Sequence, residues 1–245
     1  MEQFFTKDYN GAPFVLFNTP HLIALGVVML VNLSLLWLRR KPGADWRRAF
    51  RYGLAALLIV DELAWHGWNW ATGQWTFQTM LPLHLCSVFV FLSAYMLITK
   101  SYPVYEYAYF LGIGGAIQAL LTPDAGRYGF PHFRAFQVMI SHGSIVTAAI
   151  FMTVVEGYRP TWRSLLRVAV GANLYMLAVG MLNWAIGSNY LFIARKPETA
   201  SLMDLLGPWP WYILSLEAVG LAICLLLYLP YAIRDRRAAS ALKAA

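Results

Sequence analysis

The residue with the clearest chemical potential is Cys86, which follows Leu81, Pro82 and His84 in a short apolar stretch. Proline favours the first turn of a helix, where its missing N–H group costs no hydrogen bond. Cys86 is therefore predicted within about one turn of a helix N-terminus, where the helix dipole and a nearby imidazole favour the nucleophilic thiolate. The alternative is an inert small hydrophobic residue, which is the commoner role of a buried cysteine.

Covalent catalysis by a cysteine needs a base within hydrogen-bond reach, and His142 is the candidate because it is predicted at the same depth. His84 points about 200° away from Cys86 in a regular helix, so it is expected to orient a neighbour or bind a metal ion. Cys224 has no histidine at its level and is predicted to be inert. Both cysteines fall inside apolar runs, so no disulfide is predicted.

Further polar side chains lie in apolar segments, where an ionisable group is costly unless it faces a cavity or a partner. Glu62 and His66 are four residues apart and share a helix face, while Asp61 points about 100° away. A site and a hydrogen-bonded structural cluster both remain open for these three. For the amide side chains of Gln118 and Asn183, hydrogen bonding between helices is the favoured role. The supporting or substrate-binding candidates are His84, Asp61, Glu62, His66, Gln118, Asn183 and Glu217.

The elements that position these groups are predicted to lie in lipid. Of the 245 residues, 59% are hydrophobic and 13% are charged, whereas about 25% are charged in soluble domains. The apolar runs are continuous, which excludes an outer-membrane barrel, a disordered chain and a nucleic-acid module. We therefore expect an all-α polytopic membrane protein with a single transmembrane domain over residues 1–245. The predicted seven-helix bundle has spans at about 21–38, 47–67, 81–99, 104–121, 136–156, 164–185 and 211–233.

Basic residues predict the orientation, because lysine and arginine accumulate on the cytoplasmic side. The connectors after the first, third and fifth spans, with the adjoining first turns of the next spans, and the C-terminal tail hold 14 of the 19 lysines and arginines. The N-terminus is thus predicted outside and the C-terminus in the cytoplasm of a multi-pass cell-membrane protein. The N-terminal residues lack the features of a signal peptide, so no cleaved leader is expected.

In this orientation the polar groups of the spans fall in one layer, roughly 8–9 Å below the outer boundary. The layer includes Asp61, Cys86, His142 and Glu217, and the inner half of the bundle holds almost no ionisable group away from its edges. This asymmetry indicates one site near the ester region of the outer leaflet. It fits a channel or transporter less well, because these need polar groups through the full depth or at the midplane.

Four motifs in order resemble the YwaF-type bacterial integral membrane proteins: LPLHLC at 81–86, QALLTPD at 118–124, SHG at 141–143 and GPWPWY at 207–212. That resemblance implies a relationship to a eukaryotic transmembrane acyltransferase of ether phospholipids. It also implies a more distant one to the androgen-induced transmembrane fatty-acid-ester hydrolases, in which threonine replaces the cysteine. By motif position the resemblance implies Cys86 as nucleophile, His142 as base and a bacterial cytoplasmic membrane as the location.

The leading hypothesis is therefore acyl transfer or acyl-ester hydrolysis on a phospholipid or lysophospholipid through a Cys86 thioester, without a metal or other cofactor. One alternative is a heptahelical zinc hydrolase, with His66, His84 and His142 as ligands and Asp61 or Glu62 activating water. A second alternative is a lipid-binding protein or transporter that grips a headgroup without turnover. No nucleic-acid partner is expected.

Overall fold

The computed structural model describes residues 2–197 and 202–244. All regular structure in these residues is helical, as predicted. The elements are α1 (Glu2–Phe5), α2 (Thr19–Leu38), α3 (Ala44–Ala71), α4 (Leu85–Thr99), α5 (Tyr102–Tyr107), the π-helix η1 (Ala108–Gly112), α6 (Ile113–Leu121), α7 (Phe133–Val154), α8 (Trp162–Ile186), the 3-10 helices η2 (Tyr190–Phe192) and η3 (Leu202–Leu206), and α9 (Trp211–Ala244).

A helical segment covers each of the seven predicted spans, but only four helices in the described part of the chain are long and apolar enough to cross a membrane. These four are α2, α7, α8 and residues Trp211–Ala238 of α9. The segment α5–η1–α6 is interrupted by the π-helix, α4 has 15 residues, and α3 buries three charged side chains. The structure thus supports a helical protein with four candidate spans, fewer than the seven predicted.

The start of α4 differs from the prediction, which placed Pro82 in the first helical turn. The helix begins at Leu85, after an extended backbone at His84 with φ −64° and ψ 146°. The cause is tertiary: the Leu81 N–H group donates to the Tyr190 hydroxyl at 2.8 Å, and the Leu83 carbonyl accepts from Tyr175 at 2.8 Å. These bonds hold residues 81–83 against η2 and α8 instead of in a helix.

Helix α7 lies at the centre of the molecule and contacts α2, α3, α4 and α6. In its most apolar 18-residue window 78% of the residues are buried, against 11–17% in the other three candidate spans. The glycines of α6 allow close packing against neighbouring helices. A Cβ atom on Gly115 would lie 3.2 Å from Leu85, and one on Gly114 would lie 3.1 Å from Ile223. Helix α6 therefore approaches both α4 and α9 closely.

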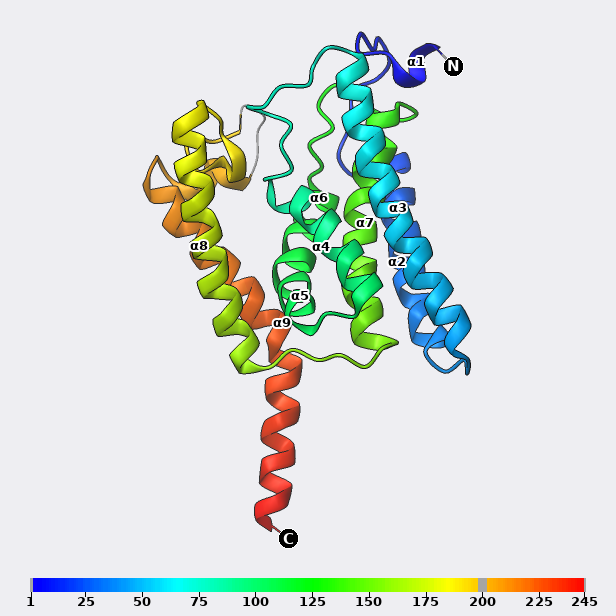
Figure 1. Cartoon of the computed structure of the whole chain (residues 1–245), viewed down its shortest axis with the longest axis vertical. Helices are drawn as coiled ribbons and strands as arrows, with labels where there is room; N and C mark the ends of the chain where they lie inside the picture. The colour runs from blue at the N-terminus through cyan, green and yellow to red at the C-terminus, as the bar shows by residue number, and fades with distance from the viewer. Residues whose placement is uncertain (1, 198–201, 245) are drawn as a thin grey trace.

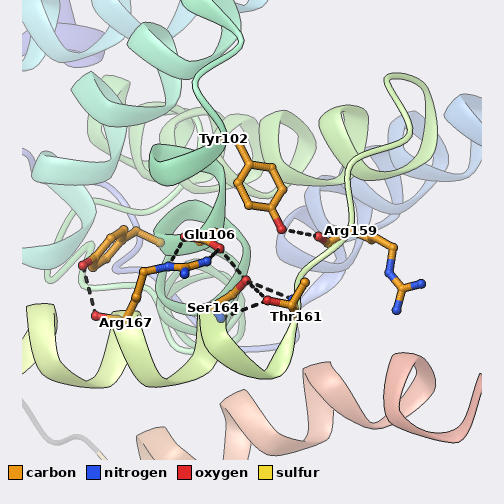
Figure 2. A network of polar contacts seen from close by, with 7 residues as sticks. Tyr102, Glu106, Arg159, Thr161, Ser164 and Arg167 are labelled. Atoms are coloured by element: carbon orange, nitrogen blue, oxygen red, sulfur yellow. Dashed lines mark hydrogen bonds and ion pairs between the residues drawn. The ribbon is translucent and has the colours of Figure 1, made fainter. Parts of the chain in front are cut away.

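Helix α8 leans away from the central helices toward its C-terminal end (Figure 1). Its N-terminal end is tied to α5 by a network around Glu106, whose side chain is 1% exposed. The carboxylate accepts from Ser164 Oγ at 2.5 Å and from both Nε, at 2.9 Å, and Nη2 of Arg167 (Figure 2). Thr161 and Ser164 also form the capping box that starts α8. The N-terminal end of α8 is therefore fixed to α5. Further along α8, a cavity lies between this helix and α4.

Candidate functional site

A cavity of about 920 Å³ lies between α3, α4, α5, α7, α8 and α9, within the size range of ligand pockets. Its walls are mostly apolar, with the charged and polar side chains toward the ends of α4 and α7 that carry Cys86 and Arg134. Six of the nine predicted site residues line it: Cys86, His142, His84, Glu62, His66 and Glu217. The fold thus brings predicted groups from four helices, α3, α4, α7 and α9, to one space.

Cys86 is the second residue of α4 and lies partly buried in the cavity wall. The first four N–H groups of a helix have no partner within the helix, and they carry the positive end of its dipole. The thiol therefore lies beside free backbone N–H groups, which are suited to a developing oxyanion. This placement agrees with the predicted position within one turn of a helix N-terminus.

The imidazole of His142 is oriented by its own helix. Its Nδ1 lies 2.7 Å from the Val138 carbonyl oxygen, and because a carbonyl only accepts, Nδ1 carries the proton. The Nε2 atom of the neutral ring is then an acceptor, as a general base requires. Among the described residues no hydrogen bond joins His142 to Cys86, although both side chains line the same cavity.

Glu62 and His66 face each other across one turn of α3, with Oε1 and Nε2 3.5 Å apart. The Trp75 Nε1–H group donates to His66 Nδ1 at 3.0 Å, which places the ring proton on Nε2, toward the carboxylate. His84 packs against the rings of Tyr190 and Phe192, with ring centroids 5.2 and 4.9 Å away. Glu62, His66 and His84 all line the cavity, and Phe192 of the connector after α8 lines it beside His84.

Three predicted site residues do not line the cavity. Asp61 is buried and accepts a hydrogen bond from Gln137 at 3.0 Å. Gln118 donates to the Gly114 carbonyl of its own helix at 3.4 Å, so it makes no interhelical bond there. Asn183 bonds to the connector that follows α8, donating to the Tyr190 carbonyl at 2.8 Å. Their geometry is that of structural hydrogen bonds.

The sequence reasoning missed Arg134, which lies in the first turn of α7 and lines the cavity. Its guanidinium carbon lies 4.0 Å from the centre of the Trp65 ring, and its Nη2 donates to the Asp124 carbonyl at 2.9 Å. No carboxylate within the described ranges pairs with it at ion-pair distance. Its four-residue spacing to Val138 and again to His142 places all three on one helix face, and this was the available signal.

The three histidines of the zinc alternative do not form a ligand set. Within residues 2–197 and 202–244, no group of three or more His, Cys, Asp or Glu side chains is arranged to hold a metal ion. His66 accepts on Nδ1 and carries its ring proton on Nε2, and His84 lies between aromatic rings. The zinc alternative therefore has no support in the described residues.

Comparison with known proteins gives a family and no closer relative. No curated protein and no solved structure matches the chain significantly. The predicted resemblance to YwaF-type proteins and their acyltransferase relatives stays a prediction. The model of the TMEM164 family matches residues 16–228, and with the apolar helices described above it supports a multi-pass membrane protein. Because the match covers most of the 245 residues, the chain belongs to the TMEM164 family.

Proposed function

We propose that this protein is a membrane-embedded lipid acyltransferase or acyl-ester hydrolase that forms a thioester on Cys86, with His142 as general base. The observation that carries the proposal is the shared cavity: a thiol at a helix N-terminus and an imidazole with an acceptor Nε2 both line it. Nucleophilic catalysis by cysteine requires this pair of groups. The motif resemblance implies the same two residues in the same roles.

In the first half-reaction, Cys86 Sγ passes its proton to His142 Nε2 and attacks the carbonyl carbon of a lipid ester. The ester C–O bond breaks, and Nε2 gives the proton to the leaving lysolipid oxygen. In the second half, a lysophospholipid hydroxyl or water loses its proton to Nε2 and attacks the thioester carbonyl carbon. The C–S bond breaks, and Nε2 returns the proton to Sγ. Free N–H groups in the first turn of α4 are suited to the oxyanion of each step. Since no hydrogen bond joins the pair, the mechanism requires the two side chains to close on substrate.

A phospholipid or lysophospholipid is the proposed substrate. Arg134 lines the cavity without a carboxylate partner among the described residues, and a guanidinium binds phosphate oxygens in a bidentate manner. Val138 separates Arg134 and His142 by one turn each on the same face of α7. The phosphate and the reacting ester of one lipid would therefore lie along one helix.

The proposed topology has seven spans, with the N-terminus outside and the C-terminus in the cytoplasm of a bacterial cell. Consecutive long segments run in alternating directions through the bundle (Figure 1). Helix α3 is long enough to cross, and its charged side chains Arg51, Asp61 and Glu62 are buried in the protein, where their cost is lower. The connectors that hold 14 of the 19 basic residues would all lie on the cytoplasmic side.

The test is a search for an acyl adduct by intact mass after incubation of the purified protein with phospholipid. The adduct is expected on the wild type and on Cys224→Ala, whose thiol lies outside the cavity, and it is expected to be absent from Cys86→Ala. His142→Gln should slow adduct formation by about 10²-fold or more, since it removes the general base.

Two results would contradict the proposal: no adduct on the wild type under turnover conditions, or unchanged activity in Cys86→Ala. If phospholipid binds tightly but no ester bond is cleaved, the polar groups of the cavity serve lipid binding or transport. Each variant is compared with the wild type by thermal unfolding in detergent, so that a misfolded protein is recognised.

A further inference from the structure

The cavity is larger than the two reacting groups need, and its second part is apolar. Beyond the polar groups its walls continue along α4 through Phe89 and Leu92 to Val104 of α5, with Ala172 of α8 opposite. We call this part the apolar arm. The exposed surface of the whole cavity is dominated by carbon, which suits the apolar part of a ligand.

The direction of the arm follows from the helices that line it. Cys86 is near the first residue of α4, whereas Pro103 and Val104 lie just after the turn that follows the last residue of α4. The 15 residues of α4 rise about 22 Å. The arm therefore leads from the thiol toward the opposite end of α4, parallel to the direction in which a lipid tail extends from its ester.

Tyr107 bridges α5 and α8 in the last part of the arm, about one helical turn from Val104. Its hydroxyl donates to the Arg167 carbonyl of α8 at 3.1 Å, and its ring lies over Gly171. A Cβ atom at Gly171 would come within 2.1 Å of the Tyr107 hydroxyl. The ring packs on bare backbone there, so the position of Tyr107 depends on the absence of a side chain at Gly171.

The position of Tyr107 is also fixed from the preceding residue. Glu106 binds Arg167 through two nitrogens and accepts from Ser164, and this network joins the same two helices beside the Tyr107 contact (Figure 2). A buried, fully engaged carboxylate of this kind holds its partners in one geometry. The far end of the arm is therefore a rigid part of the structure.

We propose that the apolar arm binds the acyl chain that is attached to the reacting ester, and that Tyr107 ends the arm and sets the preferred chain length. The proposal rests on the proposed function, because it extends the same site from the thiol to the tail of the substrate. An acyl chain is the occupant that fits: the arm is apolar, it is continuous with the reactive groups, and the protein lies among lipids whose esters carry such chains.

The experiment measures binding of phosphatidylcholines that differ only in acyl length to Cys86→Ala protein, by native mass spectrometry with pairs of lipids in competition. Tyr107→Ala in this background is expected to shift the preference toward longer chains, by about twofold for each additional methylene that gains packing contacts in the arm. Tyr107→Phe keeps the ring and loses the hydrogen bond, so its preference should stay that of the parent. Tyr105→Phe, which alters a hydroxyl bound to Thr153 outside the cavity, is the matched control.

An unchanged length preference in folded Tyr107→Ala would overturn the proposal, as would an equal shift in Tyr105→Phe. Gly171→Ala supplies a second test, because the added methyl group must displace the ring and should alter the preferred length. The assay needs no turnover. A shift in length preference without any acyl adduct on the wild type would support acyl-chain binding in the arm and contradict the proposed catalysis. An adduct without a shift in length preference would support the catalysis and contradict the role of the arm.

Discussion

Arg134 occupies a position that its own helix disfavours, since a cation in the first turn of a helix opposes the dipole by about 0.3–1 kcal/mol. The cost is offset locally by the Trp65 ring and by the Asp124 carbonyl. Aspartate or glutamate would suit the helix better, yet neither would present donors to the cavity. The Gln137 side-chain oxygen also accepts from Arg134, and the proposed phosphate ligand would supply an anionic partner.

Replacement of Arg134 is expected to weaken the binding of lipids that carry a phosphate and to leave the binding of phosphate-free lipids unchanged. Arg134→Met should weaken binding of phosphatidylcholine to the Cys86→Ala protein by about tenfold, because hydrogen bonds to charged groups contribute about 1.5–3 kcal/mol. Binding of diacylglycerol, which lacks the phosphate, should stay unchanged, and Arg134→Lys should retain part of the phosphate contact. Competition binding with the two lipids checks this, with Arg127→Met at an exposed connector position as control. Equal losses for both lipids would indicate a purely structural arginine.

At the scale of elements, the N-terminus of α7 is held by a histidine instead of the usual short polar residue. His132 is fully buried, its Nδ1 accepts from the Arg134 N–H group at 3.0 Å, and its Nε2 lies 3.0 Å from the Thr6 carbonyl. Both bonds require the neutral ring, with the proton on Nε2. The residue thus joins the cap of α7 to the N-terminal segment, and protonation would break the cap.

Burial lowers the pKa of His132 below its ordinary value, so the unfolded chain takes up a proton at higher pH than the folded protein does. The contribution to stability is complete above about pH 6.5 and is lost as pH falls from there through the lowered pKa. His132→Asn keeps a cap acceptor but cannot titrate. Thermal unfolding in detergent over this range should therefore show a weaker acid dependence in His132→Asn than in the wild type. Parallel curves for the two proteins would exclude His132 as the titrating group.

The sequence predicted the helical segments well, because apolar runs separated by charge and proline are local signals. It predicted the start of α4 less well, because the bonds from Tyr190 and Tyr175 that hold residues 81–83 come from a segment about a hundred residues later. Tertiary contacts also explain why only part of the predicted polar layer lines the cavity. Depth along a helix follows from residue number, whereas direction around the axis depends on packing, which turned Asp61 toward Gln137 and away from the cavity.

On the scale of the whole molecule, the number of spans decides where the termini lie. Four spans are an even number and would place both termini on the same side of the membrane, whereas seven spans place them on opposite sides. Helix α4 has only 15 residues, and α3 and the interrupted segment α5–η1–α6 fail simple criteria of length and apolarity because they bury charge or contain a π-helix. Both features are tolerated where protein, instead of lipid, surrounds the helix.

Single cysteines at Asn10 and Ala238, both exposed positions, test this in a chain that also carries Cys86→Ala and Cys224→Ala. With a membrane-impermeant thiol reagent on intact cells, Asn10→Cys should be labelled, and Ala238→Cys should be labelled only after permeabilisation. The reason is the basic tail, whose arginines resist translocation. Labelling of both positions from one side would reject seven spans. If instead Ala238→Cys is labelled on intact cells and Asn10→Cys only after permeabilisation, the number of spans is still odd but the orientation is inverted. Cys86 and the polar end of the cavity would then lie at the inner leaflet.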